Sequence, residues 1–120
     1  MIIYPPTKSL KVIDNFIDDV LIKLLRNLFL KLPHYYGHSS VQGTGSAFYN
    51  ADLPLNDTMV NYLCEKIQRV EGMPIKILRV YFNVQHSGMD GDWHEDDGDT
   101  TYLLMITKTL KPGDGCFEIK

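Results

Sequence analysis

An acidic segment at residues 90–99 (DGDWHEDDGD) separates two stretches that are typical of β-strands, so the second half of the chain is constrained to a strand–loop–strand arrangement. The flanking stretches are residues 75–84 (IKILRVYFNV) and 100–107 (TTYLLMIT), both rich in β-branched and aromatic residues. In an extended chain, side chains two positions apart project to the same side. We therefore expect His94 and Asp96 to point the same way and to offer an imidazole nitrogen and a carboxylate oxygen to one metal ion.

Two ligands do not hold a catalytic metal by themselves. With one further histidine, His94 and Asp96 would form the 2-His-1-carboxylate set that leaves three positions open on Fe(II). No histidine follows His94 in the sequence. His34, His38 and His86 are the other candidates, and His86 is the nearest to the pair along the chain. The alternative interpretation is a solvated acidic loop, because acidic turns are common.

The first half of the chain carries the apolar period of two helices. The first is predicted over residues 15–31, with Asp14 or Asn15 as its N-cap and Pro33 just after its end. The second is predicted over residues 57–70. Helices first and strands afterwards favour an α+β fold with the helices packed on one face of an antiparallel sheet.

Between and after these elements the pattern is weaker. Residues 34–45 are predicted to be irregular, residues 47–49 to form a short strand, and residues 116–119 to form a last strand. A strand at the end of a chain needs a neighbour to satisfy its backbone groups. We therefore expect residues 1–120 to be a single domain that is cut short at its C-terminal side.

Composition limits the class of protein. A chain of 120 residues that is 44% hydrophobic and 22% charged is typical of one small globular domain. Its formal net charge of −3 gives no electrostatic reason to expect a nucleic acid or an anionic membrane as partner. Asp18, Lys23 and Arg26 interrupt the N-terminal apolar run, so we expect no signal peptide or membrane span there. Cys64 and Cys116 lack a CxxC partner, which favours reduced thiols in a cytoplasmic protein.

Several short motifs follow one another in a fixed order over most of the chain. They are residues 12–16 (VIDNF), 79–83 (RVYFN) with Gly88, 93–96 (WHED), 97–101 (DGDTT) and 113–119 (GDGCFEI). In this order they resemble the Fe(II)/2-oxoglutarate-dependent dioxygenases, and among these the prolyl 4-hydroxylase-like group. The tripeptide His-x-Asp is a weak signal alone, whereas the ordered set is considerably more specific.

The resemblance implies a double-stranded β-helix, or jelly-roll, backed by N-terminal helices. It implies Fe(II) as cofactor, 2-oxoglutarate as co-substrate, ascorbate as an accessory reductant, and a small-molecule or peptidyl substrate. His94 and Asp96 would be the first two iron ligands, and Tyr81 would point into the barrel towards 2-oxoglutarate. The family's third ligand is a later histidine, followed by an Arg or Lys that pairs with the co-substrate, and neither has a matching residue here. We therefore expect a fragment with impaired activity.

Two other functions fit the same residues. One is a non-catalytic remnant or binding module that keeps the β-scaffold without the iron. The other is a two-ligand metal site that a partner chain completes. Tyr81 also has a structural alternative, as a core aromatic on a strand.

Overall fold

A computed structural model of the chain describes residues 1–4, 10–38, 47–86, 88–89 and 91–107. Within these residues the fold is mixed α/β, with two helices and two three-stranded antiparallel sheets. The elements follow in the order β1 (Ile2–Tyr4), β2 (Lys11–Val12), α1 (Asp19–Lys31), β3 (Tyr35–His38), β4 (Phe48–Asp52), α2 (Thr58–Glu71), β5 (Tyr81–Val84) and β6 (Thr101–Leu103).

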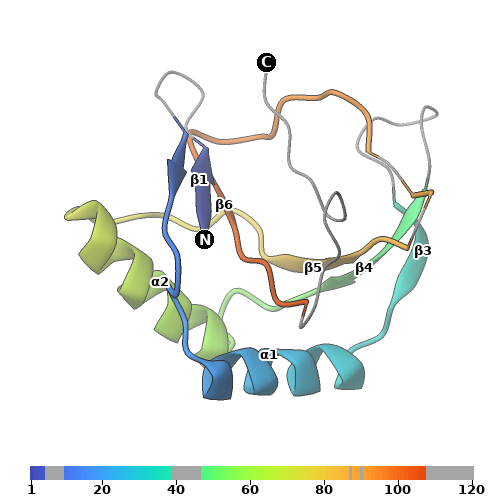
Figure 1. Ribbon diagram of the computed structural model, residues 1–120, viewed down its shortest axis with the longest axis horizontal. Coiled ribbons are helices and arrows are strands. Elements are labelled where there is room, and N and C mark those ends of the chain that lie inside the picture. Colours follow the sequence, from blue (N-terminus) through green and yellow to red (C-terminus); the bar gives the residue numbers. More distant parts are fainter. Residues whose placement is uncertain (5–9, 39–46, 87, 90, 108–120) are drawn as a thin grey trace.

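The two sheets have the strand orders β2-β1-β6 and β3-β4-β5 (Figure 1). In the first sheet β1 is the central strand. It pairs with β6, near the other end of the described chain, and Ile3 lies opposite Tyr102. In the second sheet β4 is central, and Tyr49 lies opposite Val84. The chain passes from β5 in one sheet to β6 in the other through the segment that carries the acidic residues (Figure 1).

Helix α1 begins four residues later than predicted. Asp18, and not Asp14 or Asn15, is the N-cap, and its carboxylate accepts a hydrogen bond of 2.8 Å from the amide of Leu21. Asn15 has a φ of 54°, in the left-handed region, so the chain turns there and cannot be helical. The end at Lys31 agrees with the prediction.

Helix α2 agrees with the prediction to within one residue at each end. The Asp57 carboxylate accepts a hydrogen bond of 2.8 Å from the amide of Met59, which satisfies one of the free donors of the first turn. Gly72 adopts a φ of 69° and donates its N–H to the carbonyl of Gln68 at 2.8 Å. A left-handed residue at this place is the common end of a helix and favours glycine.

The strands depart further from the sequence pattern. The predicted strand over residues 75–84 is regular only in β5, although Leu53 also donates to the carbonyl of Val80 at 3.0 Å. The predicted strand over residues 100–107 is reduced to β6. The short strand predicted at 47–49 is confirmed as part of β4, and the predicted strand at 116–119 lies outside the described residues.

Three strands were not expected, and they overturn the order of helices first and strands after. β1 and β2 precede both helices, and β3 lies within the stretch predicted to be irregular. Each of the three gains its backbone partners from a strand elsewhere in the chain, so its own sequence carries little signal.

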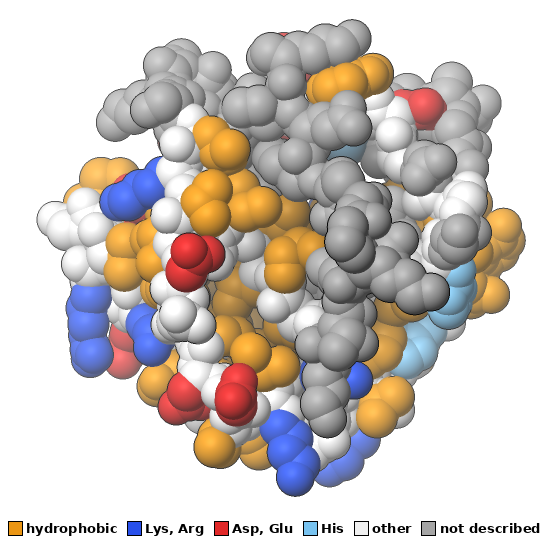
Figure 2. All heavy atoms as spheres, viewed as in Figure 1, with side chains coloured by type: hydrophobic (Ala, Val, Ile, Leu, Met, Phe, Trp, Pro, Cys, Tyr) orange, Lys and Arg blue, Asp and Glu red, His pale blue; other side chains and the backbone are white. Residues whose placement is uncertain are grey.

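One apolar core connects the helices with both sheets. Phe16 and Ile17 in the turn before α1, Leu25 on α1 and Ile67 on α2 are its buried members. Phe82 of β5 and Tyr102 of β6 pack against this cluster, one from each sheet. Figure 2 shows further hydrophobic side chains on the surface of this face. Among the residues that the structure describes, no helix has the length and hydropathy needed to cross a membrane.

Candidate metal site in the acidic loop

The structure brings His94 and Asp96 together in the loop between β5 and β6. The His94 Nε2 atom lies 3.2 Å from Asp96 Oδ1, and the two side chains are 36% and 40% exposed. The i, i+2 spacing thus places an imidazole and a carboxylate against each other at the surface. Their binding of a metal ion stays a prediction.

The contact made by the other ring nitrogen of His94, Nδ1, indicates which of the two nitrogens carries the hydrogen. Nδ1 lies 2.7 Å from the backbone carbonyl of Asp92. A carbonyl oxygen can only accept, so Nδ1 must be the donor. In a neutral imidazole the lone pair is then on Nε2, which faces a carboxylate oxygen that also only accepts. With a neutral imidazole, Nε2 and Oδ1 therefore approach as two acceptors, an arrangement that a cation bound to both atoms would stabilise.

Asp96 is oriented from the strand that follows the loop. The hydroxyl of Thr101, the first residue of β6, donates to Asp96 Oδ2 at 2.8 Å. Thr101 is itself placed by its pairing with Tyr4 of β1. This leaves Oδ1 directed at His94. Such outer contacts, a carbonyl behind the histidine and a hydroxyl behind the carboxylate, typically orient metal ligands.

The separation of the two atoms suits neighbouring positions on one ion. Imidazole nitrogen and carboxylate oxygen bind first-row divalent metals such as zinc at about 2.0–2.2 Å, so two such ligands at a right angle lie about 3.0 Å apart. The observed 3.2 Å is close to this value. A divalent metal could therefore be bound by both atoms with small shifts.

Of the other three histidines, His34 and His86 are engaged elsewhere, and the side chain of His38 lies outside the part of the chain that the structure describes. The ring of His34 stacks on Phe29 with centroids 4.3 Å apart, and its Nε2 lies 2.8 Å from the Phe29 carbonyl. His86 lies edge-on to Tyr49 with ring centroids 6.1 Å apart. Within the described part of the chain, no group of three or more His, Cys, Asp or Glu side chains is arranged to hold a metal ion. His86 is therefore not placed as the third ligand.

Tyr81 lies on β5 and is half-buried. Its neighbour Phe82 packs against the core and meets Phe29 of α1 edge-on, with ring centroids 5.4 Å apart. Because successive strand residues alternate between faces, Tyr81 is on the face turned away from α1. It is thus not a member of the helix-facing core. The guanidinium of Arg79 lies 4.3 Å above its ring.

Three contributions were missed by the sequence analysis. The carbonyl of Asp92 and the hydroxyl of Thr101 hold the pair, and Arg79 covers Tyr81. Positions 79 and 81 were a usable signal, because side chains two positions apart share a side in an extended chain. The Asp92 contact is made by a backbone carbonyl, so the side-chain pattern does not indicate it. Nothing local to Thr101 indicates its bond to Asp96. Asp92 also has a buried carboxylate oxygen, Oδ2, that lacks a hydrogen-bond partner among the described residues.

Comparisons of the chain with family models, with curated proteins and with solved structures found no match. The resemblance to the dioxygenases therefore rests on the motifs of the sequence alone.

Proposed function

We propose that this chain is a domain of the Fe(II)/2-oxoglutarate-dependent dioxygenase type, in which His94 and Asp96 are two of the iron ligands. The observation that carries the proposal is the contact of 3.2 Å between His94 Nε2 and Asp96 Oδ1. With Nδ1 engaged by the Asp92 carbonyl, this contact pairs two acceptors when the imidazole is neutral, and such a pair suits the binding of a cation. The ordered motifs of the sequence make iron the cation that we propose.

We further propose that the two sheets are part of a double-stranded β-helix. The arrangement that supports this is two antiparallel sheets with a crossing segment between them, since β5 belongs to one sheet and β6 to the other. The proposed ligands His94 and Asp96 lie on that crossing segment. In such a fold the face of β5 that bears Tyr81 would be the inner one.

In this assignment each residue has a separate task. His94 supplies a neutral nitrogen and Asp96 supplies one negative charge, which leaves Fe(II) with low net charge and open positions. Thr101 and the Asp92 carbonyl hold these two ligands in place. Tyr81 offers a hydroxyl to the co-substrate. When bound, iron with 2-oxoglutarate and oxygen supplies the power to hydroxylate an unactivated C–H bond of the substrate.

The residues present fit two of the three iron ligands. The family's later histidine and the basic residue for the co-substrate have no matching position in this sequence. A metal site draws its affinity from the number and fixed geometry of its ligands. We therefore expect weak Fe(II) binding and slow or no turnover of 2-oxoglutarate by this 120-residue chain.

The test is metal binding by the whole chain, with Co(II) as a spectroscopic substitute for Fe(II). Visible absorption bands of bound Co(II) should appear on titration and should be lost in His94→Ala and in Asp96→Asn. Asp97→Asn is the matched control, because Asp97 is an exposed acid of the same loop. Equal Co(II) binding by all three variants would overturn the proposed ligands. Succinate formation with Fe(II), ascorbate and 2-oxoglutarate then measures turnover.

A metal-free binding module is the second candidate function. It is favoured by the finding that no three ligating side chains gather within the described residues. In that case His94 and Asp96 contact each other without a metal ion. Absence of any Co(II) signal from the folded chain would favour this function.

A further inference from the structure

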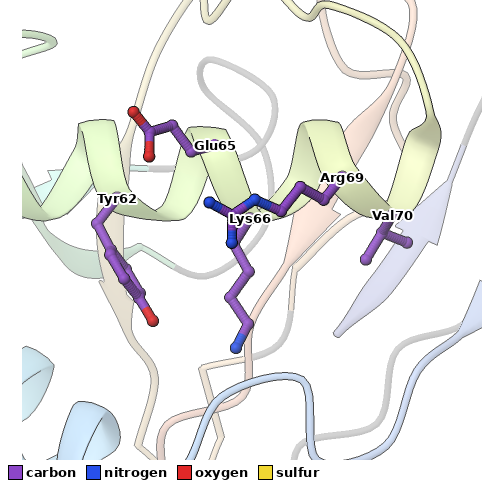
Figure 3. Close-up of a pocket in the computed structure, with 5 residues that line it drawn as sticks. All are labelled: Tyr62, Glu65, Lys66, Arg69 and Val70. Atoms are coloured by element: carbon purple, nitrogen blue, oxygen red, sulfur yellow. The ribbon is translucent and has the colours of Figure 1, made fainter.

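A shallow hollow beside α2 lies outside the acidic loop and has a different chemistry. Its cavity volume is about 290 Å³, and it is lined by Tyr62, Glu65, Lys66, Arg69 and Val70 (Figure 3). All five lie on one helix, with Tyr62, Lys66 and Arg69 at intervals of four and three residues. Residues at these intervals are neighbours along one stripe of a helix surface.

The charges on this stripe are not balanced locally. Figure 3 shows the side chains of Tyr62 and Lys66 extending to the same side of α2, whereas the Glu65 carboxylate points to the opposite side. Glu65 and Arg69 have the spacing of a helical ion pair, but no such pair forms. Within the described residues, neither Lys66 nor Arg69 forms an ion pair with a carboxylate. With no carboxylate partner among the described residues, these two cations could both bind an anion.

The ammonium group of Lys66 is held in place by a ring. It lies 5.4 Å from the centroid of Phe16, within the range of a cation–π contact. Phe16 is buried in the core, so it is a fixed support. Less conformational freedom then has to be lost when this cation binds a ligand.

Apart from Glu65, whose carboxylate points to the opposite side of α2, the remaining lining is apolar, and the space is small. Tyr62 is 48% exposed and Val70 is 37% exposed, so both offer carbon surface to a ligand. Ligand pockets usually measure about 300–1,000 Å³, which places this hollow at the lower limit. It suits one ring or a short alkyl chain with a single charged group.

We propose that this hollow binds a small phosphate monoester that carries an apolar or aromatic body. Lys66 and Arg69 pair with the phosphate oxygens, the guanidinium through two parallel N–H groups. The phenol of Tyr62 donates a further hydrogen bond, while its ring and Val70 contact the apolar body. The site is independent of the proposed metal site, since it shares no residue with it.

The test is an NMR titration of the full chain with phenyl phosphate, with inorganic phosphate as the comparison. Saturable shifts should appear at Tyr62, Lys66, Arg69 and Val70, and phenyl phosphate should bind more tightly than inorganic phosphate. Lys66→Gln and Arg69→Gln should each weaken binding by about fivefold, as expected for losing one partly exposed charge contact. Lys76→Gln, which removes an exposed cation outside the hollow, should leave the affinity unchanged.

Three outcomes would overturn the proposal. The first is shifts that spread over the surface without saturation. The second is an equal loss of affinity in Lys76→Gln, which would indicate attraction by overall charge. The third is equal affinity for inorganic and phenyl phosphate, which would remove the role of Tyr62 and Val70. The backbone amide spectrum of each variant shows at the same time whether it is folded.

Discussion

The acidic loop and helix α2 both place charged side chains at the surface, but different forces hold them. In the loop no residue from 91 to 100 is in a helix or strand, and His94 and Asp96 are fixed by bonds to Asp92 and Thr101. On α2 the helix itself spaces the cations, and its ends are closed by Asp57 and Gly72. Damage to the loop contacts should therefore change one site, whereas damage to the ends of α2 should change the stability of the whole domain.

Among the changes that affect one region and not the other, we expect the largest effect from Thr101→Val, which should lower the metal affinity of the loop. This change removes the hydroxyl that holds Asp96 Oδ2 and keeps the shape of the side chain. Loss of an outer contact of this kind typically lowers metal affinity by about tenfold or more. Co(II) titration measures it, and the thermal midpoint should change little.

Thr100→Val is the matched control for this change. Thr100 is the preceding residue and is half-buried like Thr101, and no hydrogen bond of its hydroxyl is found in the described part of the chain. Its Co(II) affinity should equal that of the unmodified protein. If the two valine variants behave alike, the loop is not held as we describe.

The second effect, on α2, is expected from Gly72→Ala. No atom lies within 4 Å of a Cβ placed at Gly72, so the cost arises from its φ of 69° and not from a clash. An L-residue in this conformation costs about 1–2 kcal/mol. Chemical denaturation should show this loss of stability while Co(II) binding in the loop is retained. Gly72→Asn should lose less, because Asn tolerates the left-handed region better. An unchanged stability in Gly72→Ala would contradict the assigned helix end.

The sequence predicts these two regions unequally well. α2 was predicted to within one residue because Asp57 and Gly72 act on the backbone next to them. The start of α1 was missed because Phe16 and Ile17 continue the helical period of apolar residues although they lie in a turn. Their side chains are buried by the core, which the period alone cannot distinguish from burial on a helix.

The sheets were harder to predict because two of the four described strand pairings, β1 with β6 and β4 with β5, join strands that are distant in sequence. Ile3 pairs with Tyr102 across almost the whole chain, and neither residue indicates the other. The closeness of His94 and Asp96 followed from a spacing of two, which is local. Its support by Thr101 depends on where β6 begins, and β6 is placed by β1. The closeness of the two side chains was thus predictable, while the contacts that orient them were not.

The smallest effect concerns Tyr102, which connects the two regions. Tyr102 lies on β6 directly after Thr101, and its pKa is raised from 10.0 by burial and, in second place, by the negative charge of Glu71 at the end of α2. A raised pKa means that the folded state holds the phenolic proton more tightly than the unfolded state does. This contribution to stability is complete below pH 10.0 and is lost as the pH rises through the pKa of the folded state.

We therefore expect the free energy of unfolding to fall above about pH 10 and the fall to be smaller in Tyr102→Phe. Glu71→Gln, which removes the charge and leaves the burial, should reduce the fall only in part. Denaturation at several pH values between 8 and 11 measures all three proteins, and an identical alkaline slope in Tyr102→Phe would show that another group is responsible.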